Sequence, residues 1–479
     1  MIDTQAIKNK ILDLAMRGKL TEQNPQDVPA VVLVSELSEQ LNRQPYKSTI
    51  SDEEKPFELP VSWEWCRLSD IGSTNIGLTY HPEDVAANGT IVARSSNIVN
   101  GKMDYSDLVR VTCQIRDNQY LNTGDILICA RNGSKALVGK CALFEGDPKT
   151  IAFGAFMAVF RTPLYRFAYY FFNTTVFKRN FSSDDSKQIN QVTQAILKNS
   201  IIPIPPREEQ NRIVDIIEQA FSVLDTIDAL QAQYADNLTV LKGKLIDAAI
   251  QGKLTEQLPG DGTAAELYQQ IQKAKQELIE AGRIKKSKPL PEITADEIPF
   301  DIPENWKWVR LAEICYIING DRGKNYPAKS TLKHEGIPFI SALNLNGSSV
   351  TEDEQLLCLD ENQYERLGSG KLQKDDIVIC IRGSLGKHGR YPFEKGAIAS
   401  SLVISRLFFA PNEIGDYEMV WLDSSAFPAE IKRYDSGTAQ PNLAANSLEK
   451  FLIPLPPLAE QKRIVTRLND LLHACEGLI

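Results

Sequence analysis

The middle of the chain carries apolar residues at the spacing of a coiled coil. After Pro205 and Pro206, apolar or tolerated positions recur in alternating steps of four and three residues, so that they share one seam of a helix. Gln231 is the polar exception, and one such residue can fix the register of paired helices. At about 1.5 Å per residue the helix would be roughly 60 Å long, so we interpret it as a spacer. The seam consists of Ile213, Ile217, Ala220, Leu224, Ile227, Gln231, Tyr234, Leu238, Leu241, Leu245 and Ala248.

The segments that flank this helix have a different pattern. Gly252 is expected to end the helix, and Ala264 to Ala281 predicts a second helix that ends at Gly282. On either side, short apolar runs between Gly, Asn and Ser turns predict mixed α/β domains. The clearest expected strands are Ile91–Arg94, Ile126–Ala130, Ile337–Ser341 and Ile377–Ile381.

The chain is a tandem duplication, because four segments return in the same order. Their offsets grow slowly from 234 to 251 residues, as they do when two copies differ by small insertions. The repeated pairs are 12–23 with 246–257, 59–68 with 302–311, 125–131 with 376–382, and 202–214 with 453–465.

The phase of the duplication predicts the architecture. Ile479 corresponds to position 228 and Met1 to position 235, so the two ends together reproduce the central helical segment. We therefore expect the termini to meet and to form a second spacer, antiparallel to the first. The predicted fold is α+β, with two pseudo-twofold-related mixed α/β domains separated by long antiparallel coiled-coil helices in a circularly permuted tandem repeat. The expected segments are a helical arm at 1–55, a domain at 56–206, the spacer at 207–298, a domain at 299–457 and a C-terminal helix at 458–479.

Composition places the chain among ordinary globular proteins. Hydrophobic residues make up 43% and charged residues 24% of the sequence. No apolar run approaches a membrane span, and the start has no secretory signal. The eight cysteines contain no C-x-x-C pair, which favours reduced thiols over zinc or disulfides, and the four histidines are far apart. A net charge of −9 argues against a lone, tight DNA binder, although acidic residues concentrate outside 56–205.

Motifs for three kinds of catalysis are missing from the sequence. The run from Gly133 to Lys140 has the wrong spacing for a phosphate loop and ends in Cys141. No Asn/Asp-Pro-Pro-aromatic motif of adenine methyltransferases is present. A nuclease would need Pro-Asp followed by Glu-x-Lys, and the matches at 53–55, 430–432 and 460–462 are interpreted as solvated charge. The sequence therefore predicts no catalytic residue and no metal site.

Polar and basic loops inside the two domains are the remaining candidates. Arg131-Asn-Gly-Ser-Lys and Arg382-Gly-Ser-Leu-Gly-Lys follow equivalent strands, and 186–190 corresponds to 438–442. Arg and Lys suit phosphates or guanine, and Asn and Gln suit adenine; a structural role for these loops is an equal alternative. The paired tryptophans, Trp63 with Trp65 and Trp306 with Trp308, are interpreted as packing residues that open each domain. The candidate DNA-binding residues are Arg94, Asn97, Arg131, Asn132, Ser134, Lys135, Lys140, Lys187, Gln188, Asn344, Arg382, Ser384, Lys387, His388, Arg390, Thr438 and Gln440.

Several of the repeated motifs resemble one known family. Pro-Leu-Pro-Pro-Leu-Ala-Glu-Gln-Lys-Arg-Ile-Val (454–465), Ile-Pro-Glu-Asn-Trp-Lys-Trp-Val-Arg-Leu (302–311), Gly-Lys-Leu-Thr-Glu-Gln and Ile-Lys-Lys-Ser-Lys-Pro-Leu-Pro (284–291) are similar to motifs of the specificity subunit of type I restriction–modification systems. The resemblance spans the chain. One departure is Ala-Arg-Asn-Gly-Ser-Lys in the first copy, where the second copy has Ile-Arg-Gly-Ser-Leu-Gly-Lys.

The resemblance implies a non-catalytic reader of double-stranded DNA. Each domain would read one half of a bipartite target, and the helices would set the unread spacer. Two methylation subunits would dock on the helices, with restriction subunits joining them, and S-adenosylmethionine, ATP and Mg²⁺ would belong to those partners. The assembled complex would be an adenine-N6 methyltransferase and ATP-dependent endonuclease, cytoplasmic and associated with the nucleoid. Six seam residues are the expected spacer and docking positions: Ile213, Ile217, Leu224, Gln231, Leu238 and Leu245.

A second hypothesis comes from a different functional class. Heptad helices and a duplication would also suit a protein–protein scaffold that never contacts bases. A methylation map of the host distinguishes the two, because only the DNA reader makes N6-methyladenine at a bipartite motif depend on this gene.

Overall fold

The computed structural model describes residues 1–41, 46, 50–181, 191–347, 349–350, 356–434 and 443–477. The chain divides into two compact units, Met1–Ala232 and Gln233–Ile479. The boundary falls within one long helix, α7 (Arg207–Ile250), which contributes residues 207–232 to the first unit and 233–250 to the second.

The helices of the two units follow a similar order. The first unit contains α1 (Thr4–Met16), α2 (Ala30–Gln40), α3 (Leu68–Ile71), α4 (Tyr165–Phe172), α5 (Thr175–Lys178) and α6 (Gln194–Asn199). The second unit contains α8 (Ala264–Glu280), α9 (Leu311–Ile314), α10 (Glu361–Arg366), α11 (Glu413–Asp423), α12 (Ala426–Tyr434), α13 (Ala445–Leu448) and α14 (Leu458–Glu476). The long helix and α8 match the predicted helices, with Gly252 and Gly282 in left-handed conformations just beyond their ends.

The strands of the first unit form small sheets. The two-stranded sheet is β1 (Glu64–Arg67) with β11 (Ile201–Ile204). The four-stranded sheet has the order β2 (Ser73–Ile76), β10 (Met157–Arg161), β7 (Ile126–Cys129) and β8 (Cys141–Leu143). The remaining strands are β6 (Val109–Val111), β3 (Val85–Ala93) and β9 (Ile151–Phe153) in one sheet, and β4 (Ile98–Val99) with β5 (Lys102–Met103).

The second unit repeats this plan. Its two-stranded sheet is β12 (Lys307–Arg310) with β21 (Leu452–Leu455), and β13 (Cys315–Asn319), β20 (Leu402–Leu407), β17 (Ile377–Cys380) and β18 (His388–Arg390) form a four-stranded sheet. A second four-stranded sheet has the order β15 (Cys358–Leu359), β14 (Ile337–Ile340), β19 (Gly396–Ile398) and β16 (Lys371–Leu372). The pairs β3–β9 and β14–β19 are parallel, and the other strand pairs are antiparallel.

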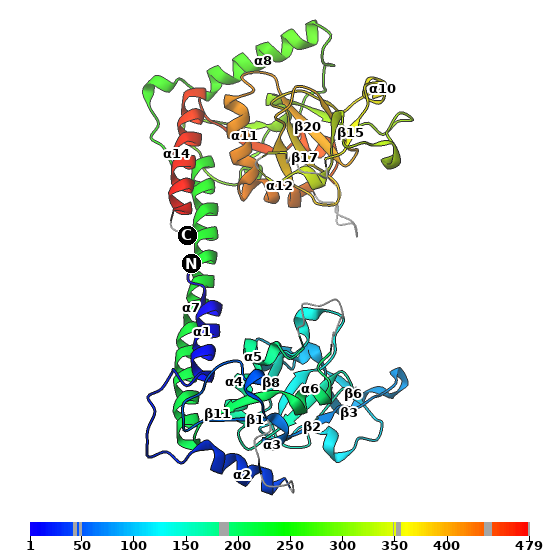
Figure 1. Cartoon of the computed structure of the whole chain (residues 1–479). Coiled ribbons are helices and arrows are strands. Elements are labelled where there is room, and N and C mark those ends of the chain that lie inside the picture. The colour runs from blue at the N-terminus through cyan, green and yellow to red at the C-terminus, as the bar shows by residue number, and fades with distance from the viewer. Residues whose placement is uncertain are drawn as a thin grey trace. The chain divides into compact units, whose positions relative to one another are not determined.

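In the first unit, α1 runs antiparallel to α7 (Figure 1). The side chain of Gln231 binds the backbone of Ile2 through both its oxygen and its amide, at 2.5 and 3.2 Å. Further along, Lys8 forms ion pairs with Asp225 at 2.7 Å and Asp228 at 3.2 Å. These hydrogen bonds raise the pKa of Lys8 above its ordinary value, the bond to Asp225 most of all, so the pair stays charged at neutral pH.

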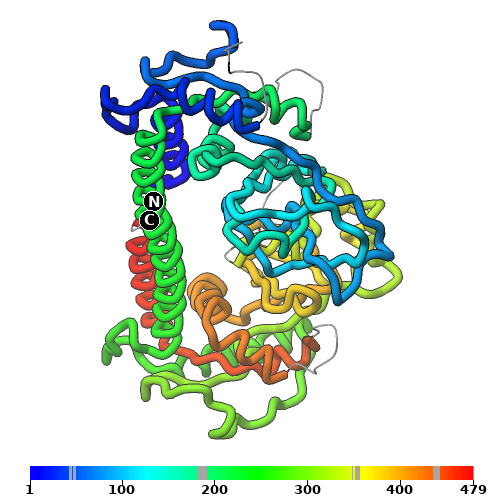
Figure 2. Tube along the Cα trace, turned by 90° about the horizontal axis from the view of Figure 1, so that it is seen from below, coloured from blue at the N-terminus to red at the C-terminus, as the bar shows by residue number. Residues whose placement is uncertain are grey.

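In the second unit, α14 takes the place that α1 has in the first and lies beside α7 in both views (Figures 1 and 2). Lys242 and Glu476, the positions equivalent to Lys8 and Asp225, are 3.5 Å apart. The antiparallel helix pairs, the mixed α/β domains and the duplicated plan confirm the predicted α+β class.

The first and last strands of each domain pair with each other. Glu64 lies opposite Ile204, and Lys307 lies opposite Leu455. This pairing brings the start of each domain beside the start of the helix that follows it. Each hydrophobic core then continues from the domain into that helix, through Ile213 and Ile217 in one unit and Ile464 and Leu468 in the other.

The tryptophans that open each domain are packing residues, as predicted. Trp63 is 5% exposed and Trp306 is 6% exposed, and the indole of each donates a hydrogen bond to a buried carboxylate. Trp65 and Trp308 contact Phe57 and Phe300. In the described part of the chain, no helix is long and apolar enough to cross a membrane.

Candidate nucleic-acid interface

The loop after β7 is the first candidate surface. The backbone amides of Ala130 and Arg131 both donate to the carbonyl of Phe156. The loop closes where Gly139, at φ +82°, donates its amide to the carbonyl of Cys129 at 2.9 Å. A side chain at Gly139 would collide with the ring of Phe181, so this closure depends on glycine.

The loop after β17 in the second unit is built in the same way but is shorter. Ile381 donates to Ser401, and Gly386, at φ +79°, donates its amide to the carbonyl of Cys380 at 3.0 Å. Between the equivalent cysteine and glycine, the first loop is four residues longer than the second. The two loops therefore differ in sequence because the first contains an insertion. The two ends of the loop are the same in both copies.

A buried thiol supports the arginine of each loop from below. The Sγ of Cys380 lies 3.1 Å from the carbonyl of Arg382, and the Sγ of Cys129 lies 3.8 Å from the carbonyl of Arg131. Burial raises the pKa of both thiols, which keeps them protonated and able to donate. The strand end thus fixes where each arginine leaves the sheet.

The structure brings several of the candidate segments together. Arg131 forms a β-bridge with Gln191, and the amide of Leu443 donates to Ile381. Gln191 and Leu443 therefore each lie beside the start of an arginine loop. Asn132 donates to the hydroxyl of Ser95 at 3.0 Å, which joins the turn after β3 to the same surface. Four predicted residues of these segments lie outside the described residues: Lys187, Gln188, Thr438 and Gln440.

Six of the predicted side chains are exposed on these loops. In the first unit they are Arg131, Ser134 and Lys135, and in the second they are Arg382, Ser384 and Lys387. The guanidinium of Arg131 lies 5.8 Å from the ring centroid of Phe156, which holds its stem at the surface. Exposed cations on short, backbone-closed loops can contact phosphates or the edge of guanine.

Two of the predicted asparagines are buried within the fold. Asn97 is 1% exposed; its oxygen accepts from the amide of Arg94, and its nitrogen donates to the carbonyls of Asp104 and Asp107. Asn344 is 3% exposed and accepts from both the amide and the hydroxyl of Ser341. Each asparagine closes a short turn within the fold, and its predicted contact with DNA stays a prediction.

Two predicted residues of β18 are also engaged within the fold. His388 is 6% exposed, and its ring nitrogens face the carbonyl of Gly386 and the carboxylate of Asp423 at 2.9 and 3.0 Å. Arg390 forms ion pairs with Asp375 and Asp416. Both side chains have partners within the domain, and their role in DNA binding stays a prediction.

Arg94 and Lys140 stabilise the first candidate surface, around the loop after β7, but are not among its exposed side chains. Lys140 donates to the carbonyl of Ile98 at 2.8 Å, and Arg94 pairs with Asp107 at 2.7 Å. Both are half-buried. They hold the turn that contains Ser95 against the loop after β7. The exposed cations of this loop are therefore Arg131 and Lys135.

Much of the helix seam is buried within the helix pairs, although Tyr234 and Leu241 are each 43% exposed. Ile213 and Ile217 are fully buried, Leu224 and Leu238 are 6% and 7% exposed, and Leu245 packs against the second core. Gln231 binds Ile2, as described above. These six positions pack the helices together, in keeping with a spacer role, and their use as partner contacts stays a prediction.

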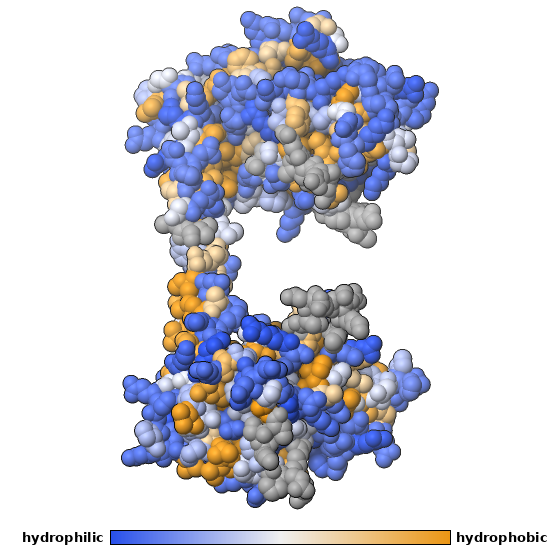
Figure 3. All heavy atoms as spheres, viewed as in Figure 1, coloured by the Kyte–Doolittle hydropathy of each residue, from blue (hydrophilic) through white to orange (hydrophobic). Residues whose placement is uncertain are grey.

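A second apolar stripe on α7 escaped the sequence prediction. Ile216, Val223 and Leu230, spaced by seven residues, are 39%, 60% and 59% exposed. Each directly precedes a seam position, namely Ile217, Leu224 or Gln231, and lies about 100° around the helix from it. Figure 3 shows apolar side chains on the viewed face of this helix pair. Their heptad spacing is visible in the sequence. It was not assigned because the longer seam repeats with the same period on the same helix.

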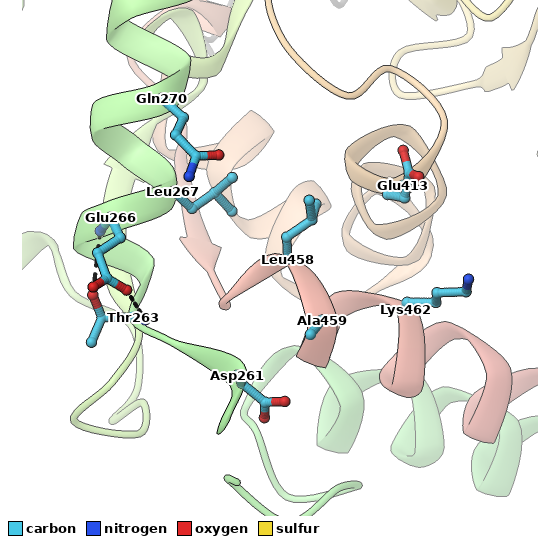
Figure 4. Close-up of a pocket in the computed structure, with 9 residues that line it drawn as sticks. All are labelled: Asp261, Thr263, Glu266, Leu267, Gln270, Glu413, Leu458, Ala459 and Lys462. Carbon is cyan, nitrogen blue, oxygen red and sulfur yellow. Dashed lines mark hydrogen bonds between the residues drawn. The ribbon is translucent and has the colours of Figure 1, made fainter. Parts of the chain in front are cut away.

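The pocket shown in Figure 4 lies between α8, α11 and α14, away from the arginine loops. Its cavity volume is about 400 Å³. Three polar side chains of its wall are used within the fold: Glu266 caps α8 with Thr263, and Asp261 binds Arg463. The lining residues are Asp261, Thr263, Glu266, Leu267, Gln270, Glu413, Leu458, Ala459 and Lys462.

Two Glu-x-Lys matches are buried rather than solvated. Glu430 is 7% exposed and accepts from the amide of Leu452, and Glu460 is fully buried. The prediction of solvated charge is therefore wrong at both positions, whereas Glu53 is exposed. Among the described residues, no group of three or more His, Cys, Asp or Glu side chains could hold a metal ion.

Comparison with known proteins gives one consistent match. The family model described as "Type I restriction modification DNA specificity domain" matches residues 60–233 and 303–478. The EcoAI specificity subunit of Escherichia coli is 26% identical, over 98% of this chain and 89% of that protein. The EcoKI specificity subunit of Escherichia coli strain K12 is 30% identical over 42% of this chain and 45% of its own. A solved chain from a study of type I R-M complex assembly and conformational transition has a similar fold, with a TM-score of 0.56 and 19% identity, covering 88% of this chain and 93% of that chain.

Proposed function

Because the chain belongs to the family of type I restriction–modification DNA specificity domains, which is non-catalytic, we propose that it reads a bipartite DNA target for a methylation and restriction complex. Each recognition domain, with the predicted limits 56–206 and 299–457, reads one half of the target. The observation that carries the proposal is the pair of equivalent loops, after β7 and β17, that expose cations on otherwise buried strand ends.

The two loops suit two different half-sites. Their closing glycines and supporting thiols are alike, but the first loop is longer by four residues. The same scaffold thus presents Arg131 and Lys135 in one domain and Arg382 and Lys387 in the other. Arg131 and Arg382 are equivalent, but Lys135 precedes the closing glycine of its loop whereas Lys387 follows it, so the two loops can contact different bases in the major groove.

Two methylation subunits are the proposed partners of the helices. The exposed stripe of Ile216, Val223 and Leu230 offers an apolar face at heptad spacing, which suits a partner helix. S-adenosylmethionine, ATP and Mg²⁺ are assigned to the partners, and restriction subunits complete the complex for cleavage. Work on chromosomal DNA implies a cytoplasmic location.

The proposal is tested by mapping N6-methyladenine in the host genome. Deleting the gene should abolish methylation at one bipartite motif, and a plasmid copy should restore it. An unchanged map, with the methylation subunits still expressed, would favour the scaffold without base readout. The purified chain alone, incubated with S-adenosylmethionine and host DNA, should transfer no methyl groups.

A further inference from the structure

A buried carboxylate joins three chain segments in the first unit. Glu209, in the first turn of α7, is fully buried. One oxygen accepts from Thr21 at 2.8 Å and from Gln23 at 2.6 Å, both in the loop after α1. The other accepts from the indole of Trp63, which opens the recognition domain, at 2.9 Å. We call these four residues and Gly18 the first joint.

The second unit has the same arrangement at the start of α14. Glu460 is fully buried and accepts from Thr255 at 3.3 Å, Gln257 at 2.8 Å and the indole of Trp306 at 2.9 Å. With Gly252, these residues form the second joint. Three of the four repeated sequence segments thus meet in each joint, although they are far apart along the chain.

Two further contacts tighten each joint. One helical turn after the carboxylate, Arg212 pairs with Asp27, and Arg463 pairs with Asp261, both at 2.5 Å. A Cβ at Gly18 would lie 2.5 Å from Pro60, and one at Gly252 would lie 2.4 Å from Pro303. The loop therefore packs too closely on the domain to slide without breaking contacts.

In each joint the helix contributes one side chain, the carboxylate. This group binds both the loop and the recognition domain. Three donors converge on the two acceptor oxygens of Glu209, and a fourth, Asn305 at 3.5 Å, joins the three on Glu460. An amide in place of either carboxylate would present a donor to at least one of them. Hydrogen bonds to a buried charge are among the strongest in proteins. The angle between helix and domain is therefore more sensitive to this group than to any single apolar contact.

We propose that Glu209 and Glu460 are positioning residues that fix each recognition domain on its own helix and thereby restrict the half-site spacing that the protein accepts. This inference rests on the proposed function. Neither residue contacts bases, so the identity of each half-site should not depend on them. The two glutamates should instead affect how strongly the protein discriminates between DNA targets that differ in the distance between the half-sites.

The test uses the full chain assembled with its methylation subunits. Glu209→Gln and Glu460→Gln are compared with the wild type on DNA duplexes that keep both half-sites and vary the spacer by one to three base pairs. The wild type should methylate one spacing, and each variant should lose about tenfold in spacing discrimination, the effect of one lost hydrogen bond to a charged group. Glu208→Gln, which changes the exposed neighbour on the same turn, is the matched control.

Each alternative outcome has a separate meaning. If a variant loses methylation equally at every spacing, or keeps full discrimination, the positioning role is refuted. If the wild type itself methylates no bipartite duplex, the proposed function fails instead. Should Glu209→Gln not fold, Thr21→Val removes one of the three hydrogen bonds to Glu209 and must still broaden the accepted spacing.

Discussion

Glu418 of α11 is a carboxylic acid that the fold buries completely. One oxygen accepts from the hydroxyl of Ser405 at 2.7 Å, and the other has no hydrogen-bond partner among the described residues. Burial raises the pKa of Glu418 to about 7, while Ser405 and the nearby His388 oppose the shift. At the corresponding turn of α4 the first unit has Ala168, so this acid is a property of the second unit alone.

The second unit should therefore lose stability as the pH rises. The pKa is about 7 in the folded chain and near 4.5 when unfolded, so the contribution is complete below pH 4.5 and is lost as the pH rises through 7. Glu418→Gln should match the wild type near pH 5 and exceed it at pH 8 by at most about 3 kcal/mol. Unfolding measured across this pH range checks the difference. Glu413→Gln, exposed on the same helix, is the control, and a flat wild-type profile would refute the prediction.

The exposed cations of the loop after β7 should contribute to the affinity for DNA as well as to recognition of its base sequence. Arg131→Ala combined with Lys135→Ala should weaken binding of the assembled complex to its target about tenfold or more and lower the salt dependence by up to one or two phosphate contacts. Anisotropy titrations at several salt concentrations measure both effects. Lys149→Ala removes a charge from the turn before β9 and should change neither. Equal losses in both variants would mean that only overall charge matters.

At the residue scale, the sequence predicted the positions of the two arginine loops better than it predicted which nearby side chains are exposed. Arg131 and Arg382 leave the sheet where the strand pattern placed them, because the buried strands β7 and β17 end at the same point in both copies. The burial of Asn97, Asn344 and His388 could not be predicted, because a polar residue near a strand has the same sequence pattern whether it faces water or bonds within the fold. Only the contacts with Arg94, Ser341 and Asp423 distinguish the two cases.

Among the elements, α7 combines two surfaces with different uses. Its seam could be predicted because buried apolar residues recur strictly, and Leu224 and Leu238 are indeed buried. The exposed stripe could not be separated from the seam, since both repeat every seven residues on the same helix. Deciding which stripe faces a partner requires the position of α1, which the local pattern of α7 does not contain.

A charge in the exposed stripe should block partner docking without unfolding the helix. Val223→Glu places a carboxylate on a face that is 60% exposed, so the cost to the free chain is small. In a partner interface the same carboxylate would be desolvated, and binding of one methylation subunit should fall by at least about tenfold. Native mass spectrometry of the mixed subunits gives the stoichiometry. Ser222→Glu, one residue away on the helix, is the control; parallel losses would exclude the stripe as the docking face.

For the molecule as a whole, the duplication was the most informative feature of the sequence. It predicted the antiparallel helix pair in each unit, and Lys8–Asp225 and Lys242–Glu476 are equivalent ion pairs in those pairs. It could not predict that Glu209 and Glu460 are buried. A glutamate in the first turn of a helix is ordinarily solvated, and the donors that bury these two come from distant segments.

Each recognition domain should behave as an exchangeable module. Replacing residues 56–205 with the corresponding segment of another specificity subunit should change one half-site of the methylated motif and leave the other half and the spacing intact. The donor segment must keep the tryptophan equivalent to Trp63, because one carboxylate oxygen of Glu209 would otherwise lose its hydrogen bond. Sequencing the methylated sites of the hybrid reports all three properties, and a change in both half-sites would contradict independent reading.

Gly18 and Gly252 have a consequence for how the gene can vary. Both glycines have a positive φ, at +62° and +68°, and both lack room for a β-carbon. Every missense change of a glycine codon adds at least that atom. Codons 18 and 252 can therefore drift only at their third base, whereas the codons of the exposed loop residues can change freely as the protein acquires new targets.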